Sequence, residues 1–132
     1  MHPDHVYGLL EADGSPAFPR AIVHVAAEDE AYWLGVANEA KASGVQKQIH
    51  AWARAATEPY RRAERLRTYQ AGAEAIAGVT IVAAHGHTPG HSAILISQGT
   101  DAVLFWGDTV HSPSVQLPAP GVTIAIDSDE TA

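Results

Sequence analysis

The sequence predicts an α/β domain in which helical segments come first and strands follow. Between residues 4 and 58, apolar side chains recur at helical spacing along most of the chain. After Gly78, short β-branched and apolar runs alternate with Gly, Pro, Asp and Ser, which is typical of strands joined by turns. The order shows no regular strand–helix alternation, so an α/β layered domain with a mixed sheet fits best.

The first half is expected to hold three helices and one strand. The helix-breaking pair Asp13-Gly14 ends the first helix, and an alternating apolar pattern marks the strand. Pro59 either ends the last helix or opens the next turn. The expected elements are a helix over Asp4–Ala12, a strand over Arg20–Ala26, and helices over Glu28–Asn38 and Val45–Glu58.

The second half is expected to form a buried sheet with polar side chains at its strand ends. The expected strands are Val79–Ala84, Ala93–Ser97, Ala102–Trp106 and Val122–Ile126. Three of them are followed at once by polar residues, namely His85 and His87, Asp108, and Asp127. Loops held by a rigid sheet are where α/β proteins carry their sites.

Composition excludes several classes of protein. The 132 residues include no cysteine, so disulfides, thiolate zinc sites and cysteine nucleophiles are excluded. A net charge of −7 argues against binding to nucleic acid, which requires concentrated positive charge. No apolar run approaches the roughly 20 residues that span a bilayer. No signal peptide is expected in this chain, and its compartment stays unknown.

Eight histidines, as many as Lys and Arg combined, are the unusual feature of the composition. His2-Pro3-Asp4-His5 offers imidazole and carboxylate ligands suited to zinc, although Pro3-Asp4 is equally a good helix start with exposed histidines. His85-Gly86-His87-Thr88-Pro89-Gly90-His91 surrounds a predicted type II turn at Pro89-Gly90, and an ordinary hairpin with surface histidines is the alternative. Gly107-Asp108 follows an apolar strand, where Asp is also a common first residue of a loop.

HPDH, then HTPGH, then GD, in this order, resembles the metallo-β-lactamase superfamily of dinuclear metallohydrolases. The resemblance is strongest to the methyl parathion hydrolase branch and its lactonase-like relatives, and extends over the segments DHVYGLL, PAFPRAIVHVAAEDEAYWL, GDTVHSPSVQ and VTIAIDSD. It implies one partial metallo-β-lactamase-like domain over residues 1–132, part of an αββα sandwich. The N-terminal half-sheet, the native N-terminus, and the C-terminal strand and helix of this sandwich are expected to be missing. The chain is therefore expected to be truncated at both ends.

The resemblance also implies roles for individual residues. The expected metal ligands are His2, Asp4, His5, His87 and Asp108, with Asp108 bridging two metals. Asp4 and Asp108 are also the expected catalytic residues, and Asp4 would orient the attacking water and pass on its proton. His91 and His111 are expected beside the ligands, and His85 at the turn. Trp33 is expected to line the substrate pocket, with a role as a core aromatic as the alternative.

The implied function is hydrolysis of a small ester, which would be a lactone, an aryl ester or a phosphotriester. The implied cofactors are two divalent metal ions, Zn²⁺ first, with Mn²⁺, Co²⁺ or Fe²⁺ as alternatives. Each metal would lack one histidine, so reduced occupancy and impaired turnover are expected. A non-catalytic metal-binding fragment is the alternative, and thioester hydrolases and redox diiron proteins share these ligands. An exposed apolar sheet surface is also expected, with a homo-oligomer as an option.

Overall fold

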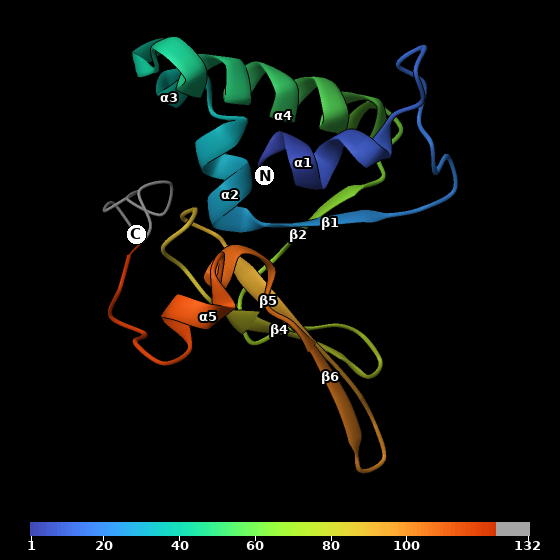
Figure 1. Ribbon diagram of the computed structural model, residues 1–132. Helices are drawn as coiled ribbons and strands as arrows, with labels where there is room; N and C mark the ends of the chain where they lie inside the picture. The colour runs from blue at the N-terminus through green and yellow to red at the C-terminus, as the bar shows by residue number, and fades with distance from the viewer. Residues whose placement is uncertain (124–132) are drawn as a thin grey trace. The chain divides into compact units, whose positions relative to one another are not determined.

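The computed structural model describes residues 1–123, and the chain divides into two compact units after Thr68 (Figure 1). The first unit, Met1–Thr68, is mainly helical. The second, Tyr69–Ala132, contains a four-stranded antiparallel sheet in its described part. The α/β class is thus confirmed, with helices before strands. The mixed sheet is not seen in the second unit, whose described strands all pair antiparallel with their neighbours. The expected strand over Val122–Ile126 and the Asp127 after it lie largely outside the described residues.

Seven elements make up the first unit. They are α1 (Pro3–Val6), the 3₁₀ turn η1 (Tyr7–Leu9), β1 (Val23–Ala26), α2 (Ala27–Trp33), α3 (Val36–Lys41), α4 (Gly44–Arg62) and β2 (Leu66–Tyr69), which pairs with β1. The expected helix over Asp4–Ala12 is shorter and changes to 3₁₀ geometry after Val6. The strand over Arg20–Ala26 begins three residues later than expected, and β2 was not predicted.

The single helix expected over Glu28–Asn38 is wrong, because the chain breaks it at Gly35. Gly35 takes an extended conformation, with φ −72° and ψ 120°, between α2 and α3. A Cβ atom added there would lie 2.3 Å from the carbonyl oxygen of Ala31. The break therefore depends on glycine for close backbone approach, which helical spacing of the neighbouring apolar residues does not reveal.

The longest helix, α4, continues through Pro59 instead of ending before it. Proline removes one backbone donor near the end of the helix, and the helix ends three residues later, at Arg62. Glu64 takes a left-handed conformation with φ 57°. The N–H of Arg65 then donates to the carbonyl of Tyr60 at 2.7 Å, and the N–H of Glu64 to that of Arg61 at 3.0 Å. This Schellman pattern satisfies the last carbonyls and stops the helix.

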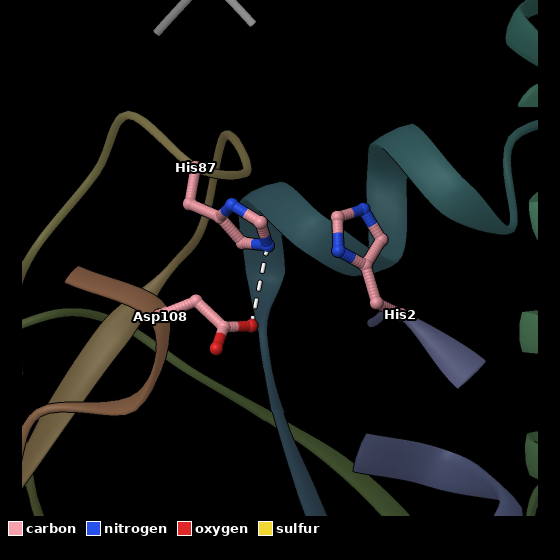
Figure 2. A group of neighbouring side chains, drawn as sticks. All are labelled: His2, His87 and Asp108. Atoms are coloured by element: carbon pink, nitrogen blue, oxygen red, sulfur yellow. Dashed lines mark ion pairs between the residues drawn. The ribbon is translucent and has the colours of Figure 1, made fainter. Parts of the chain in front are cut away.

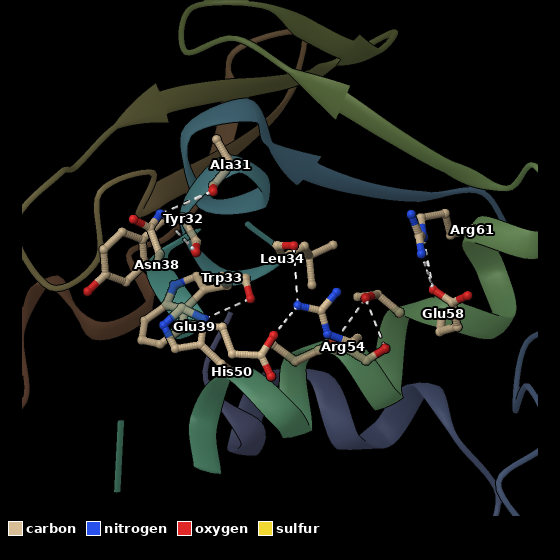
Figure 3. Close-up of polar contacts among 12 residues, drawn as sticks. Ala31, Tyr32, Trp33, Leu34, Asn38, Glu39, His50, Arg54, Glu58 and Arg61 are labelled. Atoms are coloured by element: carbon tan, nitrogen blue, oxygen red, sulfur yellow. Dashed lines mark hydrogen bonds and ion pairs between the residues drawn. The ribbon is translucent and has the colours of Figure 1, made fainter. Parts of the chain in front are cut away.

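One face of α4 forms the interior of the first unit. Its buried side chains are His50, Ala53, Ala56, Thr57 and Tyr60. Tyr60 donates its hydroxyl to the carbonyl of Leu9 at 2.8 Å and accepts the N–H of Phe18 at 3.0 Å. His50 Nδ1 lies 2.9 Å from the carbonyl oxygen of Trp33 (Figure 3). These contacts hold the N-terminal segment and α2 against α4.

A second set of polar contacts holds the α2–α3 connection to α4. Arg54 on α4 forms an ion pair with Glu39 on α3 and donates to the carbonyl of Leu34 at 3.4 Å (Figure 3). The amino group of Met1 pairs with the buried carboxylate of Asp29 on α2 at 2.7 Å. Since an unpaired buried carboxylate is costly, this contact also stabilises the start of α2.

The second unit contains the strands β3 (Glu74–Ile76), β4 (Val79–Ala83), β5 (Ser92–Gln98) and β6 (Asp101–Phe105) in that spatial order. A 3₁₀ turn, η2 (Gly107–Thr109), and the short helix α5 (Pro113–Gln116) follow. The three expected strands from residue 79 to 106 are confirmed within two residues at each end. β3 was not predicted, and it pairs with β4 through an irregular register.

Apolar side chains are exposed on this sheet, as expected. Ile96 faces Val103 across β5 and β6, and Ile94 faces Phe105. Phe105 and Val103 are each 56% exposed. Strands of this composition are usually covered on both faces, so the exposure marks a surface that packs poorly in this unit. Among the described residues, no helix is long and apolar enough to cross a membrane.

Candidate metal site

Polar side chains gather at one end of the sheet in the second unit. His87 lies in the loop between β4 and β5, and Asp108 lies in η2, directly after β6. His87 Nε2 is 3.2 Å from Asp108 Oδ2 (Figure 2). The His87 side chain is 7% exposed and the Asp108 side chain 22%, so water reaches both only in part. An imidazole and a carboxylate from separate loops thus meet in a sheltered position.

The register of the sheet explains this meeting. Ala83 pairs with Ser92, which makes residues 84–91 the loop between β4 and β5. Ile94 pairs with Phe105, so the end of β6 lies beside the start of β5 and near that loop. Side chains just beyond these strand ends are therefore neighbours, as the sequence predicted for His87 and Asp108.

The turn in the His-rich loop differs from the predicted type. The N–H of His91 donates to the carbonyl of Thr88 at 3.2 Å, so Pro89 and Gly90 are the central pair of a β-turn, as expected. The φ angle of Gly90 is not positive, however, which excludes the predicted type II turn. Proline at the first central position suits types I and II alike, so the sequence could not separate them. His85 is exposed, and its Nδ1 contacts the carbonyl of Pro89.

His91 and His111 lie beside the His87–Asp108 pair, as expected. The ring centroids of His87 and His91 are 5.8 Å apart, and those of His87 and His111 are 5.0 Å apart. His111 Nε2 is 3.8 Å from Asp108 Oδ1. Gln116 Oε1 accepts the N–H groups of His111 and of Ser112 at 2.8 and 2.9 Å, which fixes the backbone at His111.

The remaining predicted ligands lie together in the first unit, at the start of α1. Pro3 occupies the first helical turn, and His2 precedes it with extended backbone. His5 Nε2 is 3.5 Å from Asp4 Oδ2, and both side chains are largely exposed. Asp4 does not cap the helix, since no side-chain cap is formed there. Convergence of His2, Asp4 and His5 with His87 and Asp108 stays a prediction.

Trp33 lies at the end of α2 and is 3% exposed. Its ring meets His2 edge-on, with centroids 5.2 Å apart, and it also packs against Tyr32 and His50. Trp33 is therefore a core aromatic of the first unit. A contact between its ring and a substrate stays a prediction.

Two residues in the second unit matter to the site but were not predicted. Gly107 was part of the GD motif, which was interpreted through its aspartate alone, yet its φ of 55° is a conformation that favours glycine. Gln116 entered the sequence analysis only as the last residue of the segment GDTVHSPSVQ. No periodicity or spacing signals that its amide would fix the backbone at His111.

The donor set suits a divalent metal of borderline softness. Imidazole nitrogens and carboxylate oxygens, without sulfur, are the ligands of zinc, manganese, cobalt and iron sites in proteins. His87 and Asp108 already touch, and they are mostly withdrawn from water. The His87–Asp108 pair therefore fits a metal ion.

Comparisons with known proteins point to one family. The sequence profile described as "Metallo-beta-lactamase superfamily" matches residues 1–131. The hydrolase AbOPH, described as a member of the beta lactamase superfamily, is 32% identical, with a TM-score of 0.85 over 95% of this chain. This chain spans 44% of the AbOPH chain. No curated protein matches the chain significantly.

Two further solved structures share the fold at lower identity. AidC, described as a dizinc quorum-quenching lactonase in complex with the product N-hexnoyl-L-homoserine, is 22% identical with a TM-score of 0.73. The match covers 90% of this chain and 42% of the AidC chain. A probable metal-dependent hydrolase from Staphylococcus aureus is 23% identical, with a TM-score of 0.65. The match covers 83% of this chain and 36% of the Staphylococcus aureus chain.

Proposed function

We propose that this chain, which belongs to the metallo-beta-lactamase superfamily, forms the metal-binding part of a hydrolase of small esters. The observation that carries the proposal is the contact between His87 Nε2 and Asp108 Oδ2 at 3.2 Å, made by two ligand-type side chains from separate loops. Similarity to AbOPH, a hydrolase, supports the reaction type. The proposed substrates are lactones, aryl esters and phosphotriesters.

The proposed ligands are divided between two metal ions. His2 and His87 would bind one ion, Asp4 and His5 the other, and Asp108 would bind both. Zn²⁺ is the first candidate, since imidazole and carboxylate ligands suit it and AidC is described as dizinc. Mn²⁺, Co²⁺ and Fe²⁺ accept the same donors.

The chemistry of such a site is hydrolytic. When bound, divalent ions supply Lewis acidity, which lowers the pKa of water toward about 7 and polarises the bond under attack. The Asp4 carboxylate would orient the attacking water and pass its proton to the leaving group. Trp33 would offer an apolar surface to that leaving group.

Metal content and turnover of the purified chain, before and after treatment with a chelator, test the proposal. We expect zinc to bind weakly and below two equivalents, since each ion would have three protein ligands from this chain and structural zinc sites have four. Slow hydrolysis of an aryl phosphotriester or an acyl lactone should disappear with the chelator. Metal binding without any turnover would support the alternative, a non-catalytic metal-binding chain.

A matched pair of variants separates the site from the surrounding surface. Asp101 is the first residue of β6 and is exposed, whereas Asp108 lies three residues beyond the end of that strand. Asp108→Asn should lower zinc binding strongly, because the proposed bridging carboxylate loses its charge, whereas Asp101→Asn should leave it unchanged. Equal zinc binding by both variants and the unmodified chain would overturn the assignment of Asp108.

A further inference from the structure

We infer that His91 is a positioning residue that fixes Asp108 through the backbone, and this inference rests on the proposed function because Asp108 is a ligand in it. The HTPGH motif contains two histidines four residues apart, and they have different surroundings. His87 turns its Nε2 to the carboxylate of Asp108. His91 instead contacts the main chain with both of its ring nitrogens.

The two contacts of His91 determine its tautomer. Its Nδ1 is 2.9 Å from the carbonyl oxygen of Ala84, and its Nε2 is 3.0 Å from the backbone nitrogen of Asp108. A carbonyl oxygen can only accept a hydrogen bond, so Nδ1 carries the proton. The amide of Asp108 can only donate, so Nε2 is bare and accepts. The ring therefore links a carbonyl to an amide in one orientation only.

These contacts join three separate parts of the second unit. Ala84 follows β4, His91 precedes β5, and Asp108 lies three residues beyond Phe105, where the β5–β6 ladder ends. Beyond Phe105 no ladder bond of the sheet holds the chain, so the hydrogen bond to His91 ties down the segment that carries Asp108. A carboxylate on a tethered backbone has fewer orientations to lose when it binds a metal ion.

Gly107 gives independent evidence for the same arrangement. Its φ of 55° turns the chain sharply between Trp106 and Asp108. A Cβ atom added to Gly107 would lie 2.7 Å from His91 Nε2 and 3.3 Å from its Cε1. A side chain at this position would therefore push the ring away from the amide of Asp108. The glycine of the GD motif is explained by this close approach as well as by its backbone angle.

Three substitutions of His91 separate its two hydrogen bonds. His91→Gln can place an acceptor near the position of Nε2, and His91→Asn can place a donor near that of Nδ1. His91→Phe keeps a ring and offers neither. We expect His91→Phe and His91→Asn to raise the dissociation constant for zinc by about 10–100-fold, the usual cost of losing a group that orients a ligand. His91→Gln should recover most of the affinity, and Gly107→Ala should weaken binding as His91→Phe does.

Thermal unfolding of the same variants distinguishes positioning from a merely structural role. Positioning predicts that His91→Gln and His91→Asn unfold at similar temperatures while only the Gln variant binds zinc nearly as tightly as the unmodified chain. If zinc affinity instead follows the unfolding temperature through the whole series, or if His91→Phe binds zinc as tightly as the unmodified chain, the inference is wrong.

A measurement on the metal-free chain keeps this test separate from the proposed function. Nitrogen-15 NMR of the histidine rings should show His91 with Nδ1 protonated, and His91→Phe should shift the amide signal of Asp108. An Nε2-protonated ring, or an unchanged Asp108 amide, would overturn the inference whatever the zinc data show. Unaltered zinc binding by Asp108→Asn, with the expected tautomer present, would overturn the proposed function alone.

Discussion

In the first unit a tryptophan, a histidine and a tyrosine are almost fully buried, whereas in the second unit large apolar side chains on β6 remain more than half exposed. Seven of the nine buried apolar residues among residues 1–123 belong to the first unit, and only Ile81 and Ala93 to the second. The first unit is thus held by packing around α4. The second is held by strand pairing and by hydrogen bonds in its loops.

The difference bears on how each unit positions its predicted ligands. His2 rests edge-on against Trp33, so its orientation depends on an apolar interior. Asp108 and His111 depend on hydrogen bonds from His91 and Gln116 to the backbone around them. Substitutions of buried side chains in the first unit should therefore lower the stability of the chain. Substitutions of hydrogen-bonding side chains in the second unit should instead weaken metal binding.

The largest expected effect comes from truncating the buried ring of Trp33 in the first unit. Truncation of the exposed ring of Phe105 in the second unit is the comparison. Trp33→Ala should destabilise the chain by about 3–5 kcal/mol, since it empties a buried site in the first unit. Phe105→Ala should change the free energy of unfolding by less than about 0.5 kcal/mol, because the ring is largely exposed. Urea unfolding followed by circular dichroism measures both. Equal losses would show that the sheet of the second unit is buried in solution.

A smaller effect is expected from one hydroxyl group. Tyr60→Phe keeps the buried ring but removes the hydroxyl that donates to the carbonyl of Leu9 and accepts the N–H of Phe18. The carbonyl of Leu9 keeps the N–H of Ala17 as a donor at 2.9 Å, so the expected loss is that of part-buried hydrogen bonds, about 0.5–1.5 kcal/mol each. The urea midpoint should fall without a change in the slope of the transition. Tyr7→Phe, at a half-exposed ring, is the control and should leave the midpoint unchanged. A midpoint equal to that of the unmodified chain would mean that Tyr60 stabilises through its ring alone.

The predictable features were those that a local pattern encodes. Apolar runs predicted β4, β5 and β6, and polar residues at their ends predicted the meeting of His87 with Asp108. The break at Gly35 escaped prediction because it depends on how closely the glycine approaches the carbonyl of Ala31. The role of Gln116 escaped for a similar reason, since it arises from contacts that exist only once the chain after β6 has turned.

The smallest effect concerns pH. Hydrogen bonds from Arg61 and then Arg62 lower the pKa of Glu58 in the folded chain (Figure 3 shows the contact with Arg61). Ionised Glu58 therefore adds stability above its unfolded pKa, and this contribution is lost as the pH falls through the lowered folded pKa. Glu58→Gln should unfold slightly more easily at neutral pH and should show a weaker decline in acid. An unchanged acid decline would show that the pair contributes nothing in solution, as is common for exposed ion pairs.

The proposed function requires ligands from both units to bind the same metal ions, and cobalt tests this requirement most directly. Paramagnetic Co²⁺ broadens NMR signals of nuclei close to it, whereas Zn²⁺ does not. Titration with Co²⁺ should broaden the backbone signals of His2–His5 together with those of His87 and Asp108, at the same number of equivalents. Asp108→Asn should weaken both responses. Broadening confined to His87 and Asp108, with His2–His5 unaffected, would contradict the shared site.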